Sequence, residues 1–131
     1  MNTSTALPTN LSDTAVALYY SMDQREYERL QHTQRAAVPA RPPEDPILYL
    51  TLTEQHASEI AARWDAARNG SAVGYVSRLK VAKRFLDRYE VHSVGGSKYR
   101  EYWIPAEDID KLNRSLLGAI EVIGEYRAAV A

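Results

Sequence analysis

The sequence predicts a single domain of the α+β class, and three observations lead to this class. The chain has 131 residues, a length that suits one hydrophobic core. Strand-like segments, rich in β-branched and aromatic residues, are interspersed with segments whose apolar residues recur at helical spacing. Mostly strand-like segments follow the first two helix-like ones, so the pattern differs from the regular alternation of α/β proteins.

The first half of the chain is expected to hold two strands and two helices. Residues 1–13 are rich in Thr, Ser and Asn and are expected to form a flexible tail before a domain over 14–131. Ser21 and Gln24 fit a capping box at the start of the first helix. The expected elements are a strand at 14–20, a helix at 21–31, a strand at 47–52 and a helix at 53–68.

Two features refine this half. The segment 36–46 holds four prolines, so an extended loop is expected there. The helix at 53–68 carries an apolar stripe that includes Trp64, and we expect this side chain to be in the core.

The second half is expected to be mainly strands. "GGSK" reads as the turn of a hairpin, and the acids that follow Pro105 are typical of a first helical turn. The expected elements are a strand at 74–81, a short helix at 82–89, strands at 90–94 and 99–104, a helix at 106–117 and a strand at 119–126.

Composition narrows the class of partner. The net charge of −1 produces no global field that would favour nucleic acid. The chain has no apolar run near the length of a membrane span and no secretory signal pattern, so we expect no membrane partner. It has no cysteine, which excludes disulfides and thiol catalysis and fits a cytoplasmic location.

The sequence predicts no metal site. His32, His56 and His92 lie far apart, and none has a second ligand at metal spacing. We expect these histidines to be exposed or hydrogen-bonded.

Glu101 is the residue that raises a functional question. It lies in the strand-like run "REYWI", and a buried carboxylate costs free energy unless it is compensated. One interpretation is an outward-facing glutamate or an ion pair with Arg78, Lys98 or Arg100. The other is a ligand contact in a polar cleft.

Three segments carry a resemblance to a known family. "REYWIPAEDI" resembles the strand that presents the catalytic glutamate in ADP-ribosyltransferases, and "ILYLTLTEQHASEIA" resembles the second motif of that fold. "ALYYSM" lies where the first strand of the fold carries "LYHG" or "LYR". From Ala15 to Tyr126 the chain is also similar to short bacterial proteins that carry an ADP-ribosylation/crystallin-type label.

The resemblance implies a small mixed or antiparallel two-sheet core with flanking helices, and NAD as a substrate bound between the sheets. It assigns catalysis to Glu101, which would stabilise the positive charge that develops on the ribose. It assigns NAD binding to Tyr49, as the aromatic that stacks on nicotinamide, and to Tyr20, as the first-strand anchor. Thr51 is a further candidate for contact with NAD, as a substrate clamp. The alternatives are that both tyrosines pack in the core and that Thr51 and Thr53 cap a helix.

The chain departs from the family at two positions. Tyr20 replaces an Arg or His, so the NAD pyrophosphate would need another cation, for which Arg41, Arg78 and Lys80 are candidates. Tyr99 stands where arginine-modifying transferases have a second glutamate, so nothing supports an arginine target.

Two functions therefore remain open. One is an NAD-dependent ADP-ribosyltransferase or NAD glycohydrolase that acts on a protein or a small acceptor through Glu101. The other is a catalytically inactive relative that binds a nucleotide or a protein partner. Both predict that Glu101, Tyr49 and Tyr20 converge on one pocket, whereas an unrelated α+β interaction module does not.

Overall fold

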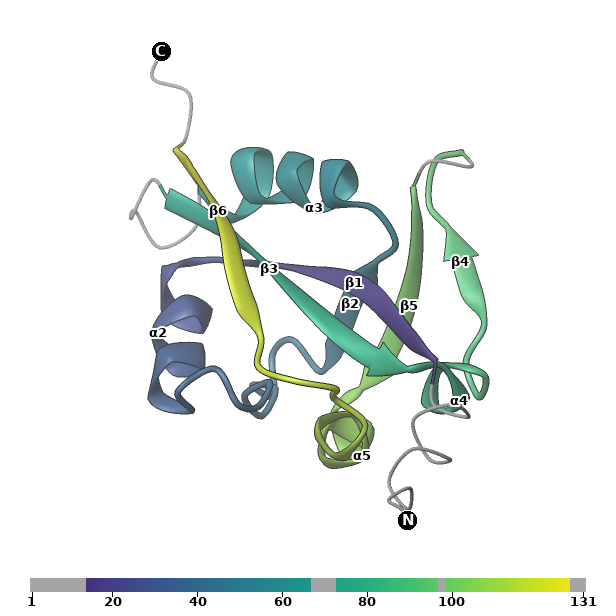
Figure 1. The fold of residues 1–131 in the computed structure, drawn as a ribbon. Coiled ribbons are helices and arrows are strands. Elements are labelled where there is room, and N and C mark those ends of the chain that lie inside the picture. Colours follow the sequence, from purple (N-terminus) through teal and green to yellow (C-terminus); the bar gives the residue numbers. More distant parts are fainter. Residues whose placement is uncertain (1–13, 67–72, 97–98, 128–131) are drawn as a thin grey trace.

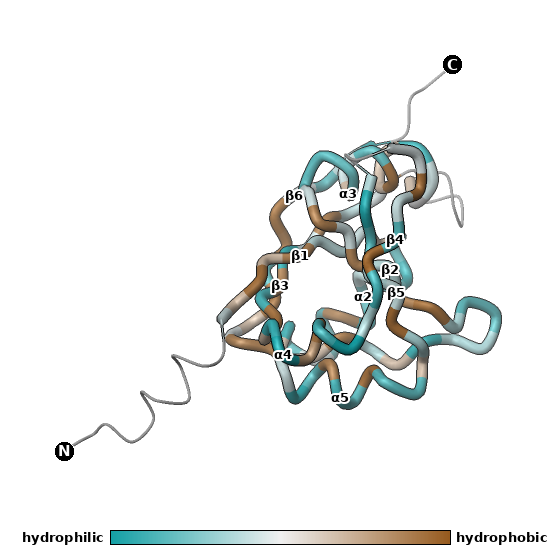
Figure 2. Tube along the Cα trace, turned by 90° about the vertical axis from the view of Figure 1, so that its right-hand side faces the viewer, coloured by the Kyte–Doolittle hydropathy of each residue, from teal (hydrophilic) through white to brown (hydrophobic). Residues whose placement is uncertain are grey.

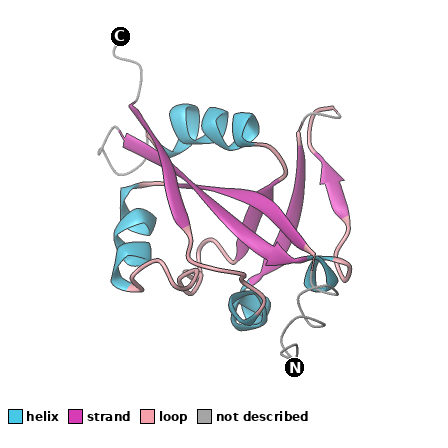
Figure 3. Ribbon diagram, viewed as in Figure 1, coloured by secondary structure: helices cyan, strands magenta, loops and turns pink. Residues whose placement is uncertain are grey.

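The six strands in the described part of the chain form one antiparallel sheet in the order β4-β5-β2-β1-β3-β6 (Figures 1 and 3). The structure is a computed structural model, and it describes residues 14–66, 73–96 and 99–127. The strands are β1 (Ala15–Met22), β2 (Ile47–Thr51), β3 (Val73–Ala82), β4 (Val91–Ser93), β5 (Arg100–Pro105) and β6 (Glu121–Arg127). The α+β class is thus confirmed.

The helices are short, and none in the described parts is long and apolar enough to cross a membrane. They are α2 (Gln24–His32), α3 (Glu54–Ile60), which continues as the π-helical turn η2 (Ala61–Asp65), α4 (Lys83–Leu86) and α5 (Ile109–Arg114), which follows the 3₁₀ turn η4 (Ala106–Asp108). Figure 1 shows α3 on one side of β1 and β3, with α2 and α5 on the other.

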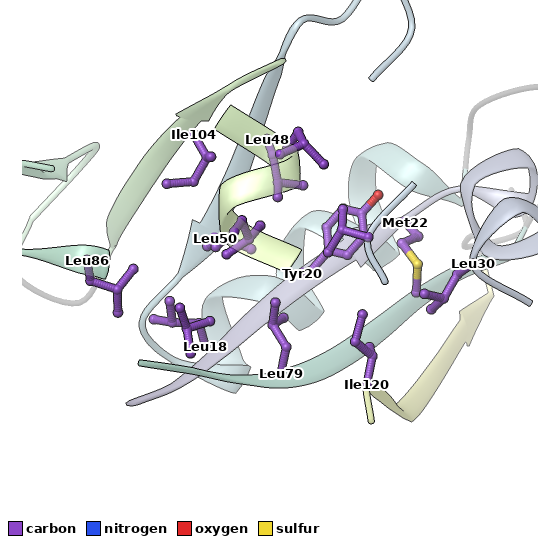
Figure 4. Packing of buried hydrophobic residues seen from close by; sticks show 14 of the residues in the cluster. Leu18, Tyr20, Met22, Leu30, Leu48, Leu50, Leu79, Leu86, Ile104 and Ile120 are labelled. Carbon is purple, nitrogen blue, oxygen red and sulfur yellow. The ribbon is translucent and has the colours of Figure 1, made fainter. Parts of the chain in front are cut away.

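The main core lies on the face of the sheet that α2, α4 and α5 cover. Alternate residues of β1 point into it, because successive side chains of a strand face opposite sides. Figure 4 shows these residues of β1 packing with residues of the other strands, of α2 and of α4, and with the residue before β6. The labelled residues are Leu18, Tyr20, Met22, Leu30, Leu48, Leu50, Leu79, Leu86, Ile104 and Ile120. In Figure 2 hydrophobic and hydrophilic residues alternate along the chain near α5, whose Ile109 and Leu112 are buried in this core.

A smaller core lies on the opposite face, under α3. Ala57 and Ala61 pack there on Val76 of β3. Gly74 makes this contact possible, because a Cβ at this position would lie 2.2 Å from the carbonyl oxygen of Ala61. α3 and η2 are therefore held close to the sheet.

The sheet opens in its middle, and this opening positions the site. β1 is paired with β3 from Ala15 to Met22, but with β2 only at Tyr19 and Thr51. Past this pair β1 and β2 part, and the next residues of both strands line a common cleft. The two-sheet core implied by the resemblance is wrong as stated, because this one contact joins both halves into a continuous sheet.

Two local predictions also need correction. Asp23, not Ser21, caps α2, since its Oδ1 accepts a hydrogen bond from the Glu26 backbone at 2.9 Å while Ser21 remains in β1. Trp64 is 66% exposed instead of lying in the core. The π-helical turn, with its hydrogen bond from Ala66 to Ala61, adds a residue to the turn and rotates Trp64 away from the buried face.

The predicted tail over 1–13 lies outside the described residues, as does part of the "GGSK" turn. The remaining predicted elements are present with shifted ends. The predicted helices at 53–68 and 106–117 are shorter α-helices extended by other helical turns.

Candidate functional site

A cleft of about 380 Å³ opens where β1 and β2 part. This volume is within the range of small-molecule sites, roughly 300–1,000 Å³. The cleft is lined by residues of β1, α2, the 36–46 loop, β2, the helix over 54–65 and β5, and by Val94, which follows β4. The described lining residues are Tyr20, Ser21, Glu26, Arg41, Asp45, Leu48, Tyr49, Ile60, Trp64, Val94, Glu101 and Trp103.

Glu101 is the buried carboxylate of this cleft, with only 6% of its surface exposed. The indole Nε1–H of Trp103 donates a hydrogen bond to its Oε1 at 2.9 Å. The Nε2 of His56 lies 3.3 Å from its Oε2. These two partners compensate the carboxylate for lost solvation and hold both of its oxygens. An ion pair of Glu101 was one alternative, and Lys98, one of its three possible partners, lies outside the described residues. Among the residues that the structure describes, Arg78 pairs with Glu121 instead, and no ion pair joins Glu101 to Arg100.

His56 reaches Glu101 from α3. Thr53 caps this helix by accepting a hydrogen bond from the His56 backbone at 3.2 Å, and this places the ring at the first turn, above β5. The ring packs edge-on against Tyr99, with centroids 5.1 Å apart. Within the described part of the chain the Nδ1 of His56 has no hydrogen-bond partner. His56 lines a neighbouring hollow that shares Ile60, Trp64 and Val94 with the cleft, so the Glu101–His56 pair lies between the two.

Three exposed aromatic side chains line the cleft, and they are Tyr49, Trp64 and Trp103. Tyr49 and Trp103 are 44% and 38% exposed and meet edge to face, with centroids 6.0 Å apart. They are opposite each other in the β2–β5 register, and so are Thr51 and Glu101. His92 of β4 stacks on Trp103 at 3.6 Å and fixes the indole that donates to Glu101. Exposed rings in a concave site are suited to stacking on a flat ligand.

The opposite wall of the cleft is a buried polar network. The hydroxyl of Tyr20 donates to the Glu26 carboxylate and accepts from Arg41 Nη1 at 3.2 Å. Arg41 also donates to Glu26, and its Nη2 donates to Asp45 Oδ2 at 2.8 Å. Burial and then the charge of Glu26 raise the pKa of Tyr20 well above its usual value, so this phenol is neutral.

Arg41 is the one cation among the described lining residues, and it is fully engaged. Burial alone would lower its pKa, but Glu26, Tyr20 and Asp45 outweigh burial and raise it. The guanidinium is charged and forms ion pairs with the carboxylates of Glu26 and Asp45. Of the other candidate pyrophosphate partners, neither Arg78 nor Lys80 is among the cleft-lining residues.

The structure brings together three of the four predicted site residues. Tyr20, Tyr49 and Glu101 line the same cleft, as expected. Tyr20 does this while its ring packs in the core, and Tyr49 is not a core residue. Thr51 is buried behind the cleft, with its hydroxyl within hydrogen-bond distance of the backbone oxygens of Tyr19 and Thr53. Its predicted contact with NAD stays a prediction, but its observed role is to join β1 and β2.

Sequence reasoning missed His56, Glu26, Trp64 and Trp103 as site residues. Only Trp103 carried a signal: it lies two residues after Glu101, and alternate residues of a strand share a face. The others reach the cleft through the fold.

A second hollow, about 440 Å³, lies between α4 and α5 and has a different chemistry. Four of its six described lining residues are basic, namely Arg84, Arg88, Lys111 and Arg114, and the other two are Phe85 and Ser115. The basic residue Lys83, close by, pairs with Asp87 at 2.9 Å. None of the polar residues described in its lining is buried, and none of the predicted site residues lines it, so we take the cleft as the candidate site.

Among the residues with described positions, no group of three or more His, Asp or Glu is placed to hold a metal ion. Comparison of the chain with protein-family models, with curated proteins and with solved structures finds no match, so the resemblance to ADP-ribosyltransferases stays a prediction.

Proposed function

We propose that this protein cleaves the bond between nicotinamide and ribose, as an NAD-dependent ADP-ribosyltransferase or an NAD glycohydrolase, with Glu101 as the catalytic residue. One observation carries the proposal. A carboxylate that is almost fully buried, with each oxygen held by a neighbour, lies in a cleft beside exposed aromatic rings. An ADP-ribosyltransferase-like fold is part of this proposal, supported by the parting of β1 and β2 at the cleft.

The residues have distinct roles in this chemistry. Tyr49 stacks on the nicotinamide ring, and Glu101 faces the ribose. As the C1′–N bond breaks, its electron pair leaves with the nicotinamide nitrogen, and positive charge develops on the ribose. The fixed carboxylate of Glu101 stabilises that charge. The acceptor oxygen, from water or a macromolecule, then bonds to C1′ and gives its proton to solvent.

A catalytically inactive relative is the second candidate, and Arg41 favours it. The first strand presents Tyr20 in place of a cation, and the nearest guanidinium is held by Glu26 and Asp45. A protein that binds a nucleotide or a protein partner without cleaving anything would tolerate this arrangement. The two candidates differ in turnover.

The test is release of nicotinamide, measured by chromatography with NAD and with nicotinamide riboside as substrates. We expect the wild type to release nicotinamide and Glu101→Gln to lose at least about 100-fold in rate, the scale of one preorganised electrostatic group. Glu107→Gln is the matched control, because Glu107 is an exposed glutamate of η4 outside the cleft. Equal rates for Glu101→Gln and Glu107→Gln, or no release from either substrate by the wild type, would refute the enzyme and favour the inactive relative.

A further inference from the structure

We propose that the cleft selects a phosphate-free pyridinium cation, of the nicotinamide riboside class, over the dinucleotide NAD. This inference rests on the proposed cleavage of the nicotinamide–ribose bond and names its substrate class, in which a nicotinamide riboside takes the place of NAD. It follows from the balance of charge in the cleft and from the state of its one guanidinium.

The described lining residues carry three carboxylates, Glu26, Asp45 and Glu101, against the single guanidinium of Arg41, a formal charge of −2. Like charges in a confined site repel, so this cleft opposes a pyrophosphate. It attracts a ring that carries one positive charge.

Arg41 does not offset this preference. Phosphate binds guanidinium through paired N–H donors. In Arg41, Nη1 donates to Glu26 and Tyr20, while Nη2 and Nε donate to Asp45. A phosphate would have to displace a carboxylate to reach these donors. The side chain is also 4% exposed, so it is a structural part of the cleft wall.

The exposed aromatic side chains provide the second, independent feature. Tyr49, Trp64 and Trp103 present ring surface at the cleft, and a cation over such a face gains cation–π attraction, strongest for tryptophan. Glu101 lies beside Trp103, so a bound pyridinium would meet a ring face and a carboxylate together. Aromatic faces combined with acids recognise an organic cation, whereas the phosphates of NAD meet no unengaged cation among the described lining residues.

Three probes that cannot be cleaved at the C1′–N bond test this by titration calorimetry: 1-methylnicotinamide, neutral nicotinamide and ADP-ribose. The first two differ by the charge on the ring, and the third is NAD without its pyridinium. We expect 1-methylnicotinamide to bind about tenfold more tightly than nicotinamide, the scale of a cation–π contact in a charged site. ADP-ribose is expected to bind more weakly than 1-methylnicotinamide. Tighter binding of ADP-ribose would overturn the proposal.

A pair of adjacent variants isolates the charge of the cleft. Asp45→Asn removes a cleft carboxylate and its ion pair with Arg41, while Glu44→Gln makes the same change of net charge one residue away, outside the cleft. Asp45→Asn should weaken 1-methylnicotinamide and strengthen ADP-ribose, and Glu44→Gln should change neither. Equal effects of both variants would contradict a cleft-specific preference.

These outcomes are separate from those of the proposed function, because the probes report binding and the release assay reports turnover. Cation-selective binding without nicotinamide release would sustain this inference and reject the enzyme. Release of nicotinamide from NAD together with tight ADP-ribose binding would support the enzyme and reject this inference.

Discussion

Glu101 shows how a single residue can be identified from sequence while its partners cannot. A carboxylate within an apolar strand indicates a functional residue, because its burial costs free energy unless polar partners compensate for lost solvation. In the structure these partners are Trp103 and His56. His56 lies far from Glu101 in the chain, and nothing in the local sequence distinguishes it from His32 and His92. Its role depends on where α3 places it, which is a property of the fold.

His56 is expected to act as a positioning residue for Glu101. His56→Phe removes one of the two contacts that hold the carboxylate, so kcat for nicotinamide release should fall roughly ten- to hundredfold with little change in KM. His56→Gln, whose amide can still donate to Glu101, should retain more activity. His32→Phe serves as the control, because His32 is exposed at the end of α2. A rise in KM at constant kcat would show that His56 contacts the substrate instead.

Ionisation of Tyr20 is expected to lower the free energy of unfolding at alkaline pH. Burial raises its pKa above the ordinary value near 10, so the unfolded chain ionises first as pH rises, and the folded state loses stability through that range. Its contribution is complete below about pH 10 and declines above it. Tyr20→Phe should cost about 1–2 kcal/mol at pH 8, from lost hydrogen bonds, and should flatten the decline above pH 10. Urea unfolding of both proteins from pH 8 to 11 measures this, and parallel slopes would contradict it.

At the scale of elements, the sequence predicted which segments are helices and strands better than it predicted which side of a helix is buried. The strands and helices follow from apolar periodicity and prolines, but the stripe on the helix at 53–68 assumed uniform α geometry. The buried alanines are Ala57, Ala61 and Ala66, so their spacing lengthens from four residues to five across the π-helical turn. Trp64 is exposed as a result. That turn begins at Ala61, where η2 approaches β3 closely. Helical periodicity alone could not reveal it.

Gly74 is the residue on which this approach depends. Gly74→Ala places a Cβ against the Ala61 backbone, which cannot move as a side chain could. We expect a loss of about 2 kcal/mol in the free energy of unfolding, the scale of overpacking a core. Displacement of η2 should also move Trp64 away from its position in the cleft and thereby weaken the binding of 1-methylnicotinamide. Chemical denaturation and calorimetry check the two effects, and an Ala variant with wild-type stability would show that the packing is looser than described.

At the scale of the whole molecule, net charge conceals the distribution of charge. The chain carries −1 overall, yet the cleft lining is acidic and the hollow between α4 and α5 is lined by Arg and Lys. Composition could exclude a global preference for nucleic acid but could not predict these local fields. The parting of β1 and β2 was likewise beyond sequence reasoning, because strand propensity does not fix how many pairs two strands form.

The most direct test of the central claim, that a pyridinium ring binds in the cleft beside Glu101, is an NMR titration of the two indole N–H signals. The chain has two tryptophans, and both line the cleft. Glu101→Gln assigns the Trp103 signal, whose hydrogen bond it alters. We predict that 1-methylnicotinamide shifts both signals with one saturation curve. Binding by calorimetry with both indole signals unmoved would place the ligand elsewhere and contradict the claim.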